Sequence, residues 1–418
     1  MTIQDNYSIK DDLFKQYAVK RGLRNADGTG VLAGLTRLSS VTGTTAGQPC
    51  HGVLTYRGHS LATLINTLKD DTYRFESVLF LLLMGRLPEP DEKQALIHFM
   101  SENRTIPDRI IRVIQDNPSS DVMNTIQTAV SLLYTADSDP DTSALTDTLS
   151  VCYKSIALIA KLPIITAYAY LTQQSDPVYC VPTEAMSTAD VFLYCLHEGK
   201  PVSELDSRLL DLSLVIHAEH GGGNNSSFTT RVIASSQSDL YSTLAGAIGS
   251  LKGPLHGAAN RKVIEMMAAI KSGVADWTNR DAIRAYLKAI MMKQAHDKTG
   301  KIYGLGHAVY TKSDPRAVVI QAEAAAIAQH YNRVDEYALY LAIAAEGPGV
   351  FQAVKQTDKV ISPNVDFFSG FVYDCLGIPS SVYTGLFALA RSAGWSAHYI
   401  EEWVSGRRII RPKYQYCD

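Results

Sequence analysis

The chain has 418 residues, of which 46% are hydrophobic and 19% are charged, and its formal net charge is -3. These values are typical of a globular protein with a large core, in two or three domains or in one large domain with a smaller one attached, and they argue against a disordered chain. No basic run or arm is present, which argues against a partner of nucleic acid.

The first elements along the chain are short. Met1–Asn6 is polar and acidic, unlike a signal peptide. Gly52–Gly58 has the best strand pattern and predicts a small hairpin. Ser77–Gly85 is apolar almost all round, which predicts a buried helix. Val78–Met84 is the longest apolar candidate in the chain, and it is too short to span a membrane. We therefore expect a cytoplasmic protein.

Helical patterns dominate the rest of the chain. Asp239 is expected to begin a helix that Gly253 and Pro254 end, and Asp314 is expected to cap a helix that has Pro315 at its first position. The other helices are expected at Val263–Ile270, Asp281–Ala295, Arg316–Gln329, Asp335–Ala345 and Ser381–Gly394. The predicted fold class is all-α.

The cysteines are scattered and form no CxxC pair, so the sequence contains neither a zinc ribbon nor a redox motif. We expect them to be small buried hydrophobic residues. They are Cys50, Cys152, Cys180, Cys195, Cys375 and Cys417.

Glycine and histidine gather in four breaks between the expected helices. These breaks are His217–Asn225, Gly253–Asn260, Lys301–Arg316 and Pro363–Gly370. Loops held by rigid helices are common places for catalytic groups, so these four segments are candidates for one site.

The segment from His217 to Asn225 has three functional interpretations. Two histidines three residues apart could bind a metal, but the pattern is not HExxH and no third ligand is apparent. His-Gly-Gly-Gly also occurs in the oxyanion loop of hydrolases, but the two nearest G-x-S-x-G matches, around Ser60 and Ser396, fail at their last position. We favour a turn that binds a small anion over these and over a plain capped turn, because Asn224, Asn225 and Ser226 follow it.

The segment Gly304–Arg316 is the strongest candidate. Gly304 and Gly306 would let the backbone approach a ligand, and His307 precedes a helix whose first turn carries Arg316. A helix N-terminus with an arginine suits a carboxylate or a phosphate. The alternative is a flexible surface turn. The segment matches neither the Walker A nor the Rossmann pattern.

Three further residues are less certain from their own segments. His256 lies between a helix end and a helix start, where its ring can face a cleft. Asp366 precedes two phenylalanines, whose desolvating effect would raise its pKa and make it a base near neutral pH, although this segment alone favours a helix N-cap. Arg391 lies in an apolar helix, and the residues alone favour a side chain that reaches the surface over a buried anion clamp.

Together these segments resemble the citrate synthase family, in order and across most of the chain. The most specific part is Gly-x-Gly-His-Ala-Val with Asp-Pro-Arg downstream, within Gly304–Arg316. Leu35–Ser40, Tyr56–His59, Leu81–Pro88 and Leu251–Gly257 also resemble the family. The resemblance implies a large helical domain made of 1–257 and 367–418 and a small domain made of 258–366, which close over a cleft.

The resemblance implies an acyltransferase that condenses acetyl-CoA with oxaloacetate and hydrolyses the adduct to citrate and CoA, without a metal or a redox cofactor. Asp366 would remove a proton from the thioester methyl group, His256 would stabilise the enol, and His307 would polarise the ketone of oxaloacetate. The other implied substrate residues are His220, Arg316, Arg391 and Arg411. The implied CoA-binding residues are Lys301, Ile302, Tyr303, Gly304, Leu305, Gly306 and Lys312.

The resemblance also implies a homodimer, in which Arg411 reaches the partner's site. Two positions depart from the family pattern: Gly221 stands where the family often has glutamate, next to His220, and Thr311 stands where some members have a basic residue for the CoA phosphates. Two alternatives stay open, namely a 2-methylcitrate synthase that uses propionyl-CoA and a catalytically silent relative that binds CoA or a dicarboxylate.

Overall fold

The computed structural model of this chain describes residues 3, 7–25, 28–45, 47–142, 144–182, 185–406 and 408–417. Of the segment Met1–Asn6, only Ile3 lies within the described residues. The described chain is mostly helical, which confirms the all-α prediction. The α-helices are α1 (Asp11–Gln16), α2 (Leu61–Thr67), α3 (Arg74–Met84), α4 (Pro90–Glu102), α5 (Asp108–Asp116), α6 (Val122–Leu133), α7 (Thr148–Leu171), α8 (Thr188–Leu196), α9 (Glu204–His217), α10 (Asn225–Ala234), α11 (Leu240–Lys252), α12 (Ala259–Gly273), α13 (Arg280–Met291), α14 (Pro315–His330), α15 (Val334–Lys355), α16 (Val365–Cys375) and α17 (Tyr383–Glu401).

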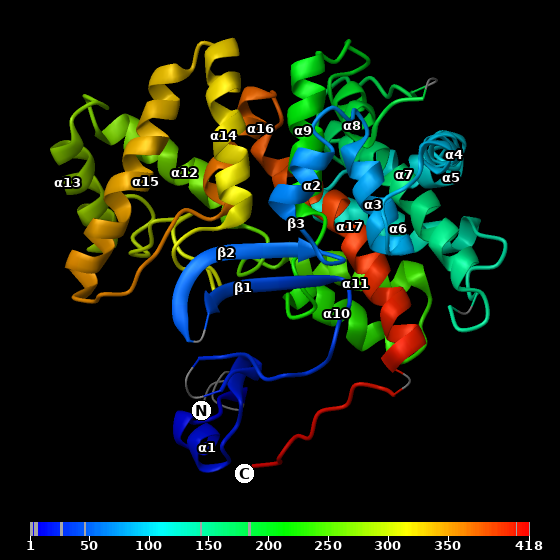
Figure 1. Ribbon diagram of the computed structural model, residues 1–418, viewed down its shortest axis with the longest axis horizontal. Helices are drawn as coiled ribbons and strands as arrows, with labels where there is room; N and C mark the ends of the chain where they lie inside the picture. The colour runs from blue at the N-terminus through cyan, green and yellow to red at the C-terminus, as the bar shows by residue number, and fades with distance from the viewer. Residues whose placement is uncertain are drawn as a thin grey trace.

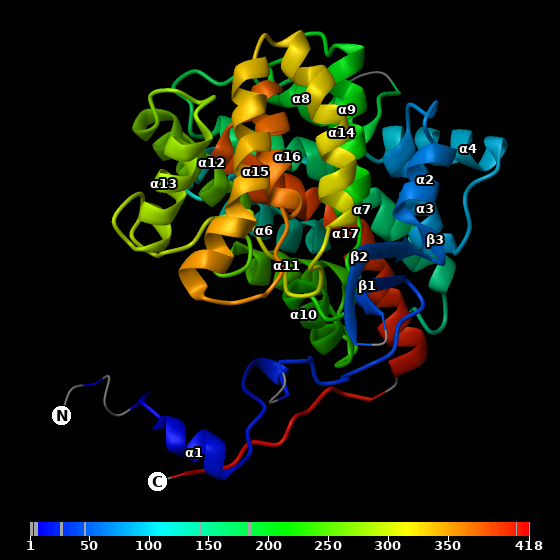
Figure 2. The same cartoon turned by 60° about the vertical axis from the view of Figure 1, so that its left-hand side comes forward.

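The helices form two neighbouring groups. In Figure 1, α12, α13 and α15 lie on the left, α2 to α11 lie on the right, and α14 and α16 stand between them. Helix α17 runs through the right-hand group and contacts α7, α9 and α11. Both ends of the chain, α1 and the C-terminal segment, extend away from the body on the same side (Figures 1 and 2).

A small antiparallel sheet lies against the loop before α14. Its strands, in the order β1-β2-β3, are β1 (Ser39–Thr45), β2 (Gln48–Tyr56) and β3 (His59–Ser60). The predicted hairpin at Gly52–Gly58 covers the end of β2 and the turn that leads to β3, but the prediction did not include β1, so it covers only part of the sheet. Glycine weakens a strand signal, and here it permits a close backbone approach. A Cβ atom at Gly43 would lie 2.2 Å from the carbonyl oxygen of Val309, and one at Gly52 would lie 2.4 Å from that of Ser313.

The helix ends follow the predicted capping chemistry. The Asp239 side chain accepts a hydrogen bond from Ser242 N, and the Asp314 side chain accepts one from Arg316 N, with Pro315 at the first helical position. Helix α15 extends to Lys355, beyond the predicted end at Ala345, because it continues through Pro348.

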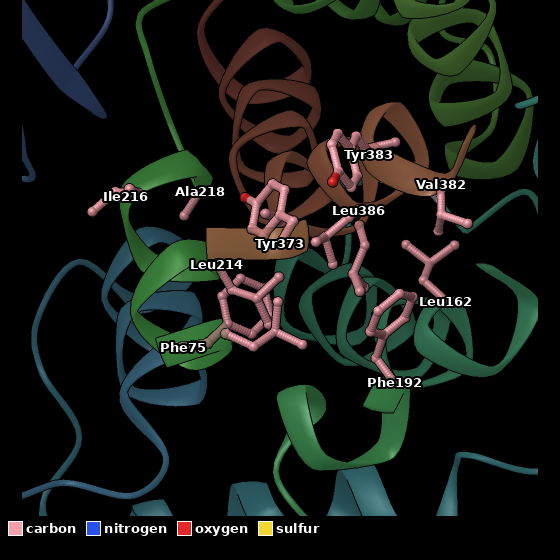
Figure 3. Close-up of a cluster of buried hydrophobic side chains, with 14 of the residues drawn as sticks. Phe75, Leu162, Phe192, Leu214, Ile216, Ala218, Tyr373, Val382, Tyr383 and Leu386 are labelled. Atoms are coloured by element: carbon pink, nitrogen blue, oxygen red, sulfur yellow. The ribbon is translucent and has the colours of Figure 1, made fainter. Parts of the chain in front are cut away.

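The main core lies beneath the group of loops that hold the candidate site. Figure 3 shows Phe75, Phe192 and Leu386 in this core, below Tyr373 and Tyr383. By length and composition α7 could span a membrane, but 61% of its most apolar window is buried inside the protein. Its apolar character is therefore explained by packing in the core.

The cysteines are all free, and the expectation that they are buried is right for half of them. Cys152, Cys195 and Cys375 are buried, whereas Cys50, Cys180 and Cys417 are partly exposed.

Candidate active site

One cavity brings together the three predicted catalytic residues and three of the four other predicted substrate residues. Its walls come from the ends of α9, α11 and α16, from the first half of α17 and from the loops before α10, α12 and α14. The predicted residues that line it are His220, His256, His307, Arg316, Asp366 and Arg391. Tyr373 and Tyr383 also line it, so the core in Figure 3 supports the cavity directly.

The remaining predicted residues do not line this cavity. Lys301 and Lys312 are exposed, and Arg411 is exposed on the C-terminal segment that leads away from the body (Figure 2). The Thr311 hydroxyl donates to the carbonyl oxygen of Gly43, at 3.4 Å, so this position contacts β1.

His307 is held in one tautomer by its own loop. Its Nδ1 accepts hydrogen bonds from Val309 N at 3.1 Å and from Tyr310 N at 3.2 Å. The proton of the neutral ring therefore lies on Nε2. Burial and the Arg316 guanidinium lower the pKa of His307 to about 4. At neutral pH this histidine is an uncharged hydrogen-bond donor, with the Tyr310 ring stacked on it at 4.7 Å.

His256 follows the end of α11 and contacts the first turn of α10. Its Nε2 lies 3.0 Å from the hydroxyl oxygen of Ser226, whose backbone N–H is bonded to the side chain of Asn224. Burial, and then the charge of Arg391, lower the pKa of His256. The ring is thus fixed and neutral.

Asp366 lies in the first turn of α16 but does not cap it, so the N-cap interpretation was wrong. Asn364 is the cap, and its side chain accepts a hydrogen bond from Asp366 N at 3.1 Å. Burial raises the pKa of Asp366 to about 6, although the charges of Arg316 and Arg391 act in the opposite direction. This is the direction expected from the neighbouring phenylalanines.

The loop before His307 is joined to the start of α16. Asn364 N donates to Gly304 O at 2.8 Å, and Asn364 Nδ2 donates to Gly306 O at 3.0 Å. Gly304 has φ +79°, and a Cβ atom there would lie 2.7 Å from Cδ2 of Phe367. Packing against α16 therefore explains this glycine, which we expected to allow the approach of a ligand.

Arg391 is completely buried, which overturns the prediction that its side chain reaches the surface. Helix α17 is buried on all sides around it, so no surface lies within reach. Its Nε donates to His217 O at 2.6 Å, while Nη1 and Nη2 have no partner within the described chain. A buried cation with two unpaired nitrogens destabilises the folded state unless an anion binds it. This makes Arg391 a candidate anion receptor.

Arg316 is also buried but is already paired. Its Nε and Nη2 donate to the two carboxylate oxygens of Asp314, at 3.0 Å and 2.8 Å. Asp314 also accepts a hydrogen bond from Val365 N at 3.2 Å. The same carboxylate therefore orients Arg316 and the backbone next to Asp366, a role that sequence reasoning missed because it assigned Asp314 only to capping.

His220 lies close to His307 and lines the same cavity as the two arginines. Its Nε2 is buried and has no partner within the described residues. Burial, and then the charges of Arg316 and Arg391, lower the pKa of His220 well below its usual value. Its ring meets that of His307 edge to face at 5.2 Å, so the two histidines form one wall of the cavity.

The two other interpretations of the His217–Asn225 segment find no support. In the described part of the chain, no three His, Cys, Asp or Glu side chains are grouped to hold a metal ion. Ser60, the first candidate nucleophile, caps α2, and Ser396, the second, is buried in α17; neither lines the cavity.

The chain matches the family model described as "Citrate synthase, C-terminal domain" over residues 25–413. It is 33% identical to a citrate synthase of Haloferax volcanii, with 95% of each chain covered. It is also 32% identical to a 2-methylcitrate synthase of Shewanella oneidensis, with 93% of each chain covered.

Two solved structures of citrate synthases have the same fold as this chain. The citrate synthase of Pyrobaculum aerophilum superposes with a TM-score of 0.78 and 30% identity, covering 95% of this chain and 92% of that one. A ternary complex of the Thermoplasma acidophilum citrate synthase with carboxymethyl coenzyme A and oxaloacetate superposes with a TM-score of 0.76 and 25% identity, covering 96% of each chain.

Proposed function

The chain belongs to the citrate synthase family, and we propose that its cavity condenses acetyl-CoA with oxaloacetate and hydrolyses the adduct to citrate and CoA. This makes it an acyltransferase. The observation that carries the proposal is the meeting, in one cavity, of a carboxylate with a raised pKa, neutral histidines and a buried arginine with free donors. The ternary complex of the Thermoplasma relative supports this substrate pair.

Asp366 is the proposed base. A thioester methyl group is a very weak acid, so the base succeeds only if the enolate is stabilised as it forms. The ionised carboxylate takes a methyl proton while the His256 ring donates a hydrogen bond to the thioester oxygen. For Nδ1 of His256 to be this donor, the Ser226 hydroxyl must donate to Nε2 of His256 rather than to Ser250 Oγ, which lies 3.3 Å from it.

His307 is the proposed polarising donor for the ketone. Its Nε2–H would bond the ketone oxygen of oxaloacetate, and the enol carbon would attack the ketone carbon to form the new C–C bond. Water then cleaves the thioester, which releases citrate and the CoA thiol. These steps require no metal and no redox cofactor.

The carboxylates of oxaloacetate are assigned to the arginines. The free fork of Arg391 suits one carboxylate, with His220 and the remaining donor of Arg316 beside it. Holding both substrates in attack geometry contributes on the order of 7–11 kcal/mol to such reactions, more than general base catalysis alone. The arginines are therefore as important as Asp366.

We also propose a homodimer in the cytoplasm, in which Arg411 completes the partner's site. Arg411 lies on an exposed C-terminal segment with Tyr414 and Tyr416, whose side chains are 90% and 81% exposed. Leu255, beside His256, is fully exposed. A second copy would cover these apolar groups. Closure of the small domain, 258–366, would bring the segment 301–306 and Lys312 to CoA.

Thiol release from acetyl-CoA and from propionyl-CoA, with and without oxaloacetate, tests the proposal. We expect release that depends on oxaloacetate and is faster with acetyl-CoA. Faster release with propionyl-CoA would establish the 2-methylcitrate synthase alternative. The two acyl groups differ by one methylene group, which changes the preference of a pocket by only ~1–3 kcal/mol. Release without oxaloacetate would indicate a hydrolase, and no release would indicate a silent relative.

A further inference from the structure

A buried glutamate lies directly before His220 and has no part in the proposed chemistry. Glu219 is fully buried, and one oxygen, Oε1, accepts hydrogen bonds from Gly221 N at 2.6 Å, from Ser39 Oγ at 2.8 Å and from His398 Nε2 at 3.0 Å. Burial alone would raise the pKa of Glu219, but His398, Arg391 and Ser39 lower it to about 2. Glu219 is therefore a buried carboxylate anion.

The hydrogen bonds around His398 have a fixed direction. Arg231 Nη2 lies 3.1 Å from His398 Nδ1, and arginine can only donate. Nδ1 of His398 is thus the acceptor, and the ring proton lies on Nε2, where it donates to Glu219. Arg231 is held in turn by Glu401 and by Glu402, the latter at 2.9 Å. The chain of contacts runs from the end of α17, through Arg231 of α10 and His398, to Glu219.

The turn after Glu219 depends on this carboxylate. Gly221 has φ +82°, a left-handed conformation that other residues adopt only with strain. Its N–H is directed back to Glu219, so the hydrogen bond closes a tight turn with His220 at its centre. On the other side, Gly394 of α17 leaves room for the second oxygen, because a Cβ atom there would lie 2.2 Å from Glu219 Oε2.

We propose that Glu219, oriented by His398 and Arg231, is a positioning residue that fixes the turn carrying His220 and thereby the affinity for oxaloacetate. The inference rests on the proposed function of the cavity. Nε2 of His220 has no hydrogen-bond partner within the described residues, so we assign the position of the ring to the backbone of this turn and to its contacts with the rings of His307 and Tyr310. Ser39 of β1 fixes the same carboxylate from the opposite side.

The variant Glu219→Gln tests the proposal by the sign of its effect on KM. The amide keeps the shape of the side chain and removes its charge, which weakens three charge-assisted hydrogen bonds. We expect the KM for oxaloacetate to rise about tenfold to a hundredfold, with the KM for acetyl-CoA changed less than twofold. If Glu219 acted only as a negative charge near a dianionic substrate, its removal would lower the KM for oxaloacetate, which would overturn the proposal.

A second pair of variants separates positioning from folding. The amide nitrogen of His398→Gln can reach the place of Nε2, whereas that of His398→Asn reaches only the place of Nδ1. We expect a near-normal KM for oxaloacetate in His398→Gln and a raised one in His398→Asn. An equal KM for oxaloacetate in the two variants would exclude the positioning role. So would variants that have an unchanged KM and differ only in the fraction of active enzyme and in the unfolding temperature.

A matched control is Glu323→Gln, which removes a surface ion pair with Arg208 and should leave both KM values unchanged. If Glu219→Gln does not fold, Ser39→Ala and the His398 pair carry the test, with Ser39→Ala expected to raise the KM for oxaloacetate. The unmodified protein is assayed first. If it releases no thiol with oxaloacetate, the proposed function fails, whereas normal release with an unchanged KM in every variant refutes the role of Glu219 alone.

Discussion

The pKa of Asp366 predicts a loss of activity in mildly acidic solution. The base works only when ionised, and burial raises its pKa from 3.8 to about 6. At pH 5 roughly a tenth of the enzyme would then carry an ionised base, compared with more than about nine-tenths for an aspartate of ordinary pKa. His307 does not titrate in this range, because its pKa is lowered to about 4.

The assay is the pH dependence of kcat/KM for acetyl-CoA at saturating oxaloacetate, between pH 5 and pH 8 at constant ionic strength. We expect an acid limb in which the rate falls as one proton binds, with its midpoint near pH 6. The variant Asp366→Asn should lower kcat by about a hundredfold to ten-thousandfold and remove this limb.

Two results would refute the reasoning. A rate that stays level down to pH 5 would mean that Asp366 is not desolvated in the working enzyme. An acid limb that persists unchanged in Asp366→Asn would mean that another group produces it.

Four further predictions concern single side chains. Since the folded state disfavours ionised Asp366, stability falls as pH rises from 3.8 towards 6, so Asp366→Asn should be more stable than the unmodified protein at pH 7, by up to about 3 kcal/mol in urea unfolding; equal stability would contradict this. Arg391→Lys should raise the KM for oxaloacetate at least about a hundredfold, because one ammonium group cannot replace both the guanidinium fork and the hydrogen bond to His217 O. A change below tenfold would contradict the assignment of a substrate carboxylate to Arg391. Ser226→Ala should lower kcat about tenfold and leave the KM for oxaloacetate unchanged, because only His256 loses a restraint. Arg411→Ala and Asp366→Asn should each be nearly inactive alone and recover activity when the two are unfolded and refolded together, since a mixed dimer has one complete site; no recovery would argue against a shared site.

Local chemistry made most of the fold predictable. Asp314, Pro315 and Asp239 begin helices as their capping chemistry requires. The strand β1 was missed because Gly43 interrupts its pattern for a contact with Val309, far away in sequence. A long-range contact of this kind leaves no periodic signal.

The site residues were identifiable by type, but their partners were not. The sequence shows that Arg391 lies in an apolar helix, and only the packing of α17 on all sides decides that its charge is buried. Asp314 looks like an ordinary cap, yet it also binds Arg316 and Val365 N. The pairing of Glu219 with His398 joins positions 179 residues apart, which no local pattern could reveal.

The hydrogen bonds of Asn364 to Gly304 and Gly306 have a consequence for how this enzyme could be altered. They join the start of α16, which carries the base, to the loop of His307, while His256 is in contact with Ser226 of α10. The base that acts on the acyl group and the donor that acts on the ketone are thus held as one unit, and His256, the proposed donor to the thioester oxygen, is held separately. Substitutions around His256 are therefore expected to alter the acyl group that is accepted, during evolution or by design, while the hydrogen bonds between Asn364 and the loop of His307 keep Asp366 and His307 in place.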